Sequence, residues 1–257
     1  MTGIRRVSQL GTTGESTYVD GSIQAADIAL GAVTGEKLAN GYIYVQTIYY
    51  TSSTTFTKAT YPWLRAIKAR VQGGGGAGGG TPNTGSYGWA SGGGGGSGGY
   101  SEKFITNISG LSASETITVG AAGSLVTGGT GGTGGTSSAF SISCTGGVGG
   151  TGSSGSQAIA VMSGGSGGTA TGGDLNANGV QGGTGLQHDN MVVGGNGANS
   201  ILGAGAGVTA AYRVSYAIQY NNSSGYGAGG NGASTSEASA RTGGTPTQGI
   251  VILELYA

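Results

Sequence analysis

Apolar and polar residues alternate in several short stretches of the chain, which is the pattern of half-buried β-strands. Ile67, Ala69 and Val71 point to one side of such a stretch, and charged residues separate them. The closing stretch 250–256 is apolar on both sides up to Glu254, so we expect it to lie centrally in a sheet. Further strands are predicted at residues 43–48, 100–108, 115–119, 140–144, 157–162 and 208–220. The pattern therefore predicts a mainly β fold.

Blocks of glycine separate these strands, and glycine makes up 62 of the 257 residues. Residues 128–136 repeat Gly-Gly-Thr with a period of three, which equals the residues per turn of the polyproline II helix. Such a helix carries its threonines on one edge and bare glycine on the others, so neighbouring helices can approach closely. We expect packed polyglycine II segments, with Gly129, Gly132 and Gly135 against neighbours and the threonines exposed. The alternative is a set of flexible Gly/Ser loops.

The N-terminal segment holds a ten-residue repeat over residues 21–41. Each copy has too few apolar residues to bury a core alone, so the apolar residues are expected to meet across chains. The expected trimerisation residues are Ile23, Ile28, Val33 and Leu38. This predicts an N-terminal attachment and trimerisation stalk at 1–42, followed by a glycine-rich β domain at 43–257; the alternative is a disordered arm.

Charge is scarce and balanced, since 8% of residues are charged and the formal net charge is zero. Nucleic-acid binding needs clustered Lys and Arg, so no nucleic-acid partner is expected. The many Gly, Ser, Thr and Asn residues predict a neutral surface suited to sugars or protein loops. Cys144 is the only cysteine and follows an apolar residue on a predicted strand, so we expect a buried small hydrophobe. No cofactor and no metal site are predicted.

Three inserts between the glycine blocks carry the candidate binding residues. The candidates are Tyr87 and Trp89 in the first insert, His188, Asp189 and Asn190 in the second, and Tyr220, Asn221 and Asn222 in the third. Aromatic side chains give rigid contact area, and Asn, Ser and Gly adapt around them. A His–Asp pair could also belong to a catalytic site, but the chain has one histidine and no nucleophile-elbow motif, so a surface loop is favoured. Tyr212, Tyr216 and Tyr220 could instead pack on one face of an element.

Several motifs resemble the glycine-rich domain of tailed-phage tail-fibre proteins. They occupy residues 67–76, 98–103, 115–123, 135–140, 225–230 and 249–256. The repeat at 21–41 is similar to the short repeats of phage fibre stalks. The alternation of blocks and inserts is also similar to some T-even-type phage adhesins, in which polyglycine II helices pack and the inserts form receptor-contacting loops.

This resemblance implies a receptor-binding protein at or near the tip of a virion tail fibre, assembled in the host cytoplasm. We expect a non-enzymatic, homotrimeric adhesin that joins other tail-fibre or baseplate proteins through its N-terminus. The expected receptor is a bacterial surface glycan or an outer-membrane protein. The alternatives are a purely structural fibre component and a fibre-borne polysaccharide depolymerase, which would need two facing carboxylates.

Overall fold

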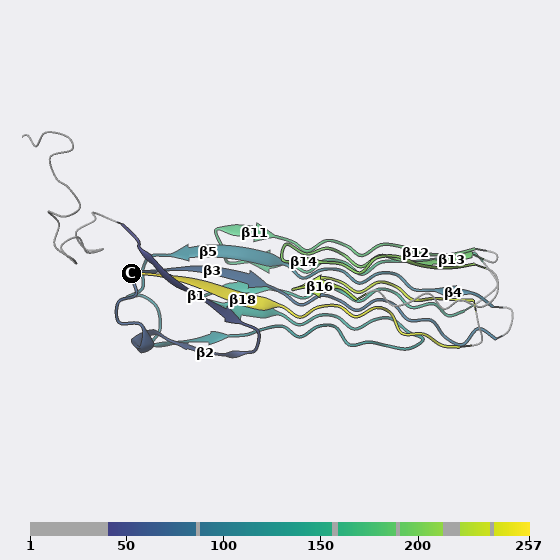
Figure 1. Cartoon of the computed structure of the whole chain (residues 1–257), viewed down its shortest axis with the longest axis horizontal. Coiled ribbons are helices and arrows are strands. Elements are labelled where there is room, and N and C mark those ends of the chain that lie inside the picture. The colour runs from purple at the N-terminus through teal and green to yellow at the C-terminus, as the bar shows by residue number, and fades with distance from the viewer. Residues whose placement is uncertain (1–40, 86–87, 156–158, 189–190, 213–221, 237–238) are drawn as a thin grey trace, which may run out of the picture. The chain divides into compact units, whose positions relative to one another are not determined.

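A computed structural model of the chain describes residues 41–85, 88–155, 159–188, 191–212, 222–236 and 239–257 (Figure 1). The chain divides into two units, Met1–Ile43 and Tyr44–Ala257. Nearly all described residues belong to the second unit, to which the following account applies. The N-terminal repeat, with Ile23, Ile28, Val33 and Leu38, lies outside the described residues. No helix in the described part of the chain is long and apolar enough to span a membrane.

A five-stranded antiparallel sheet forms one end of this unit (Figure 1). Its order is β1 (Tyr44–Tyr50), β18 (Ile250–Tyr256), β3 (Ala66–Gln72), β5 (Tyr100–Ile105) and β11 (Leu175–Ala177). The predicted central position of the closing strand is confirmed, because β18 pairs with β1 on one side and β3 on the other. The predicted alternation in β3 is also confirmed, because Ile67, Ala69 and Val71 are fully buried.

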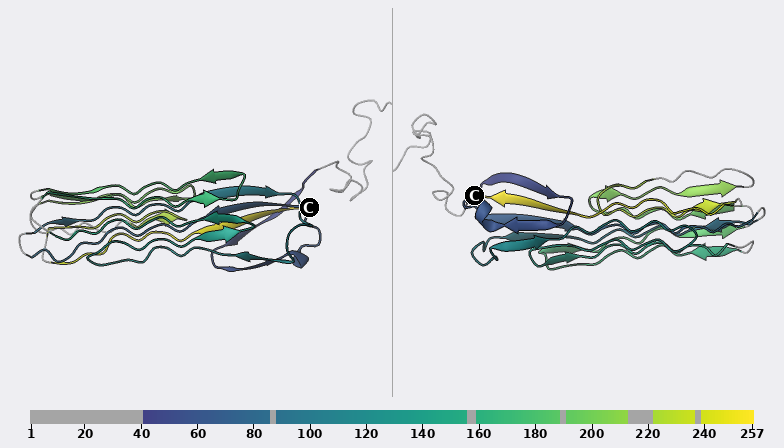
Figure 2. Two further views of the ribbon diagram at one scale, coloured as in Figure 1. Left: turned by 180° about the vertical axis from the view of Figure 1, so that it is seen from behind. Right: turned by 90° about the horizontal axis from the view of Figure 1, so that it is seen from below.

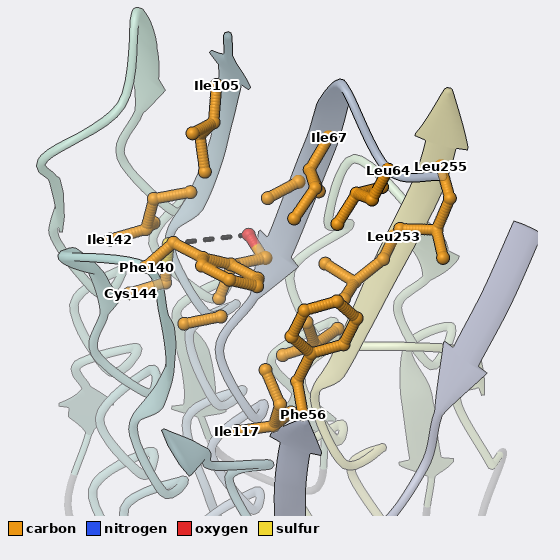
Figure 3. Packing of buried hydrophobic residues seen from close by; sticks show 14 of the residues in the cluster. Phe56, Leu64, Ile67, Ile105, Ile117, Phe140, Ile142, Cys144, Leu253 and Leu255 are labelled. Carbon is orange, nitrogen blue, oxygen red and sulfur yellow. Dashed lines mark hydrogen bonds between the residues drawn. The ribbon is translucent and has the colours of Figure 1, made fainter. Parts of the chain in front are cut away.

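Two smaller sheets cover the inner face of this sheet. One has the order β10 (Ala170–Thr171), β8 (Ile142–Cys144) and β7 (Ser137–Ala139), and the other pairs β2 (Thr54–Thr57) with β6 (Ser114–Ile117). A 3-10 turn at Lys58–Thr60 follows β2. The apolar core lies between these layers (Figure 3) and includes Phe56, Ile117, Phe140 and Leu253. Each such side chain contributes roughly 1.5–3 kcal/mol of burial free energy.

The structure differs from the predicted strand 140–144 at its first two residues. Phe140 and Ser141 have φ of 48° and 66°, and they form the tight turn between β7 and β8. Two central residues with positive φ suit a short hairpin because their backbone twist matches that of the flanking strands. Phe140 tolerates this conformation while its side chain is buried in the core. The strand therefore begins at Ile142.

The glycine blocks continue from these strands as extended segments that lie side by side (Figures 1 and 2). We call these segments threads and number them in chain order. Threads 1 to 11 occupy residues 73–81, 91–99, 120–126, 129–136, 145–153, 163–169, 178–184, 194–200, 203–208, 227–233 and 241–249.

The threads are joined by backbone hydrogen bonds with a period of three. In thread 1, Gly73 donates to thread 2, Gly74 to thread 4 and Gly75 to thread 11, and every third residue repeats this order. Thread 1 also accepts bonds from threads 3, 5 and 10, which gives it six neighbours. Thread 2 likewise donates to threads 5, 7 and 10 and accepts from threads 1, 6 and 8. The predicted packing of polyglycine II segments is confirmed, and its arrangement is hexagonal. We call it the glycine lattice.

The bonding order places the threads in three layers, with threads 4, 5 and 6 above threads 3, 1, 2 and 7, and threads 11, 10 and 8 below. Thread 9 lies against threads 8 and 10. Threads 1 and 2 are buried along their whole length, because other threads surround them. In the upper layer every third residue is exposed, as expected for Thr130, Thr133 and Thr136.

The close spacing of the threads explains why glycine is needed. A Cβ at Gly132 or Gly135 would lie closer than 3.0 Å to the backbone of Ser124 or Ala121 in thread 3, so both expectations are confirmed. The expectation for Gly129 is wrong, because a Cβ there meets only a methyl group of Val126, at 3.2 Å. Gly129 stands at the beginning of thread 4, next to the turn from thread 3, and its Cβ would not point at the backbone of another thread.

Candidate functional site

The far end of the glycine lattice gathers segments from distant parts of the sequence. Threads that follow one another in the chain mostly run in opposite directions. The segments that connect them therefore lie alternately beside the five-stranded sheet and at the opposite end of the lattice. We call that opposite end the tip and define it as the described parts of residues 81–91, 153–162, 185–194, 209–212 and 234–241. Figure 1 shows β4, β12 and β13 there, away from β1, β3 and β18.

Short strands fix the tip segments to one another. A four-stranded antiparallel sheet has the order β15 (Thr209–Tyr212), β13 (Met191–Gly194), β12 (Gly185–His188) and β9 (Ala160–Met162). Beside it, β4 (Ala90–Ser91) pairs with β17 (Ser234–Thr235), and β4 contacts both β12 and β13. Farther from the tip, β14 (Gly203–Ala204) pairs with β16 (Ser224–Gly225).

The inner side of the four-stranded sheet is anchored to the lattice. Gln187 and Val192 are buried there, and the hydroxyl of Ser153, at the end of thread 5, donates to Gln187 Oε1 at 3.3 Å. The Thr209 hydroxyl donates to the carbonyl of Gly232 in thread 10 at 2.8 Å. These contacts hold one side of the sheet against the lattice, so the side chains of the other side face outward.

Two of the candidate residues lie at the tip. Trp89 is partly exposed and directly precedes β4, and His188 is exposed at the end of β12. Because β4 contacts β12, the structure brings the first and second inserts to the same end of the lattice. Five further candidates lie outside the described residues; these are Tyr87, Asp189, Asn190, Tyr220 and Asn221.

Asn222, the remaining candidate, is exposed but lies away from the tip. Its neighbour Ser223 donates its hydroxyl to the carbonyls of Gly229 and Thr245, at 2.7 and 2.8 Å. Those carbonyls lie in the middle of threads 10 and 11. The structure therefore does not bring Asn222 together with Trp89 and His188.

Sequence reasoning missed an apolar surface on the outer side of the four-stranded sheet. Val161 and Val193 lie directly opposite Leu186 on the neighbouring strands, and opposed residues share a face. Val161, Leu186 and Met191 are 62%, 49% and 48% exposed, and Ile159, next to β9, is 69% exposed. We call Ile159, Val161, Leu186, Met191 and Val193 the aliphatic face. The sequence signal was weak because strands of three or four residues give little alternation.

The aliphatic face carries no charge. The four strands of its sheet contain no Lys, Arg, Asp or Glu. No charged residue occurs anywhere between Glu115 and Asp174. The absence of charge suits an uncharged binding partner, although the sequence predicted a surface of hydroxyl and amide groups rather than an aliphatic one.

Charged side chains gather instead on the outer face of the five-stranded sheet, where they pair with each other. Lys68 Nζ lies 3.1 Å from Glu102 Oε2, and Arg70 pairs with Glu254. Burial acts to raise the pKa of Glu102, but hydrogen bonds from Tyr100 and Lys68 outweigh it and lower the pKa. Burial and the bond to Glu102 raise the pKa of Tyr100.

Metal-binding groups do not converge in the part of the chain that the structure describes. There, no three His, Cys, Asp or Glu residues lie close enough to hold a metal ion. Cys144 is fully buried, and its thiol donates to the carbonyl of Val71 at 3.3 Å (Figure 3). Burial raises the pKa of this thiol to about 12, which confirms Cys144 as a buried small hydrophobe.

A family model described as a glycine-rich domain matches residues 51–256. The chain belongs to this glycine-rich domain family. The matched region begins just before β2 and ends with the last residue of β18, so it includes the lattice, the tip and the apolar core. A search of curated proteins finds no match. The glycine-rich domain is therefore the whole of the unit that carries the candidate site, except for β1.

Proposed function

We propose that this glycine-rich domain protein is a bacteriophage tail-fibre tip protein that binds a host cell-surface receptor without catalysing a reaction. The observation that carries the proposal is the gathering of several unrelated inserts at one end of a hydrogen-bonded lattice. The motif resemblance to tail-fibre proteins supplies the biological setting. In this setting the chain belongs to the virion and is assembled in the host cytoplasm.

A rigid lattice is a suitable support for binding segments. Each tip segment is held at both ends by strands or threads, so less conformational freedom is lost when a receptor binds. The aliphatic face offers uncharged contact area, and Trp89 offers a partly exposed aromatic ring at the same end of the lattice. An outer-membrane protein would contact the aliphatic face, whereas a surface glycan would stack on aromatic side chains of the inserts.

In the assembled fibre, the proposed state is a homotrimer that forms through Ile23, Ile28, Val33 and Leu38. Three copies would multiply weak receptor contacts through a raised effective concentration. The N-terminal stalk would join other tail-fibre or baseplate proteins.

A purely structural fibre component is the main competing function, and a polysaccharide depolymerase is a weaker one. A depolymerase needs two facing carboxylates that are available to act as catalytic acid and as base or nucleophile. Glu102 and Glu254, two of the described carboxylates, instead form ion pairs on the five-stranded sheet, far from the tip. This arrangement favours binding over hydrolysis.

The direct test introduces charge into the aliphatic face. Leu186→Asp combined with Met191→Asp should weaken binding of the purified protein to host cells at least about thirtyfold, because charged groups must be desolvated at the contact. The melting temperature should stay near that of the wild type, since both side chains are exposed. Val148→Asp is the matched control, because Val148 is 43% exposed on thread 5, away from the tip.

A second variant addresses the inserts. Tyr87→Ala combined with Trp89→Ala should reduce cell binding without unfolding the protein, and His188→Ala tests the second insert separately. If all these tip variants fold and bind cells as the wild type does, the tip is not a receptor site. The structural role would then be the better account.

A further inference from the structure

The first strand of the five-stranded sheet has one edge without a partner strand among the described residues. β1 is the outermost strand in the sheet order and pairs only with β18. Figure 2 shows it at the rim of the sheet, next to β18. The opposite edge is the short strand β11, whose three residues lead directly into thread 7. The long free edge of the sheet is therefore that of β1.

From Gln46 to Tyr50, this edge lacks the features by which proteins prevent strands from pairing with other molecules. Its sequence, YVQTIYY, has no charged residue and no proline. A bulge at Val45 interrupts the register once, between Tyr44 and Gln46, and the stretch from Gln46 to Tyr50 is regular. Natural edge strands are commonly short, charged, bulged or covered, and an uncharged regular edge favours pairing with another strand.

The side chains of β1 also leave the core open at this edge. Gln46, Ile48 and Tyr50 face the core, because each lies opposite a buried residue of β18. Ile48 and Tyr50 pack against the core but remain only partly buried. On the outer face, Tyr49 is 65% exposed. A further strand beside β1 would cover both the core-facing side chains and Tyr49 on the outer face.

We propose that β1 pairs with β1 of a second copy of this chain, antiparallel, about a twofold axis at Ile48. This register places Ile48 opposite Ile48 of the second copy and Gln46 opposite Tyr50 on the core side. On the outer side, Thr47 of each copy lies opposite Tyr49 of the other copy, so the pair occurs on both sides of the axis. All these residues lie in the regular stretch after the bulge, and each opposed pair falls on one face.

The strand is self-complementary in this register, which is why a second copy fits the edge. β-Branched residues opposite aromatic or β-branched residues stabilise antiparallel pairs, and no charges are brought together. Ile48 and Tyr50 of both copies would extend one apolar core across the axis. A strand pair covers less area than a standard stable interface, so the dimer should be weak and dependent on concentration.

Antiparallel pairing points the two tips in opposite directions. It therefore competes with the parallel trimer proposed from the N-terminal repeat, and it describes the free protein before it joins a larger assembly. The dimer does not depend on receptor binding at the tip, so either proposal can fail alone.

The test measures the mass of the full chain by sedimentation over a wide concentration range. The wild type should shift from one to two times the 24.6 kDa chain mass as concentration rises. Thr47→Lys combined with Tyr49→Lys places a lysine opposite a lysine at both symmetric positions. It should raise the concentration at the midpoint of dimerisation at least about tenfold.

A charge-swapped variant makes the test specific for the register. Thr47→Lys combined with Tyr49→Glu places opposite charges face to face, so it should restore the dimer. Leu175→Lys, on the opposite edge strand, is the matched control and should behave as the wild type, since Leu175 is 55% exposed. Thermal melting identifies any variant that fails to fold.

Three outcomes would overturn the proposal. They are a wild type without a two-chain species at any concentration, a double-lysine variant that dimerises as well as the wild type, and a folded lysine–glutamate variant that stays monomeric.

Discussion

The two ends of the glycine-rich domain are stabilised in different ways. In the five-stranded sheet each strand has at most two neighbours, and buried side chains such as Leu253 fill the space between layers. In the lattice, threads 1 and 2 have six neighbours each, and the space between them holds almost no side-chain atoms. The sheet therefore depends on side-chain packing, whereas the lattice depends on backbone hydrogen bonds and on the absence of Cβ atoms.

This difference explains why the two regions occur in one chain. Glycine loses more backbone freedom on ordering than any other residue, so a glycine lattice is costly to form. The strands that precede or follow threads 1, 2 and 11 are β3, β5 and β18, and they pair in the sheet with the register that the threads continue. The apolar core thus holds these three threads in the register that their own hydrogen bonds require.

The largest expected effect is at the centre of the lattice. Gly95→Val should destabilise the protein by more than about 3 kcal/mol or prevent folding, because a Cβ at Gly95 would overlap the backbone of thread 1. Thr133→Val adds no bulk at an exposed position of thread 4 and should change stability by less than about 0.5 kcal/mol. Urea denaturation of both variants measures the difference, and equal stabilities would show that the threads are loose.

A core truncation in the sheet should have a large but smaller effect. Leu253→Ala should lower the free energy of unfolding by roughly 2–5 kcal/mol, because Leu253 is fully buried in the apolar core. Leu175→Ala, at an exposed position of the same sheet, is the control. A loss below about 1 kcal/mol at Leu253 would mean that the core does not hold the sheet together.

Two glycines of thread 4 provide a finer comparison. Gly132→Ala should be clearly destabilising, by about 1–3 kcal/mol, because the new methyl meets the backbone of Ser124. Gly129→Ala should be nearly neutral, because only the Val126 side chain must move. Thermal melting of the pair measures whether the spacing between threads, rather than glycine itself, determines the cost.

Much of this fold could be predicted from the sequence. The alternation in β3 and the apolar run of β18 identified both strands, and the Gly-Gly-Thr period identified the exposed threonines of thread 4. The turn at Phe140 and Ser141 could not be predicted, because a buried aromatic residue gives no turn signal. The space for a Cβ at Gly129 was not predicted, because periodicity does not show where a thread begins.

The candidate site was less predictable than the fold. Trp89 and His188 were identified as exposed insert residues, but their common location depends on which threads are neighbours. Val161 and Leu186 were missed because apolar residues in short strands usually indicate a core, whereas here they face outward. The position of Asn222 depends on the contacts of Ser223 with threads 10 and 11, which no local pattern shows.

The smallest expected effect is on the pH dependence of stability, and it comes from Glu102 in the five-stranded sheet. The lowered pKa of Glu102 means that the ionised form is favoured in the folded state. Its contribution to stability is present above the unfolded pKa of about 4.3 and is lost as pH falls through the lower folded value. Glu102→Gln should remove this contribution to the pH dependence of the free energy of unfolding. The change should be less than about 1 kcal/mol, because the Lys68–Glu102 pair is partly exposed. Denaturation between pH 3 and pH 7, with the wild type as reference, measures it.

Backbone hydrogen exchange, followed residue by residue by NMR, tests the lattice most directly. The amides of threads 1 and 2 should be protected as strongly as those of β3 and β18, because each is buried and most donate to a neighbouring thread. In thread 4 protection should follow the period of three, with Gly131 and Gly132 slow and Thr133 fast. Rapid exchange throughout the glycine blocks, with β3 and β18 still protected, would contradict the lattice and leave only loops on a sheet.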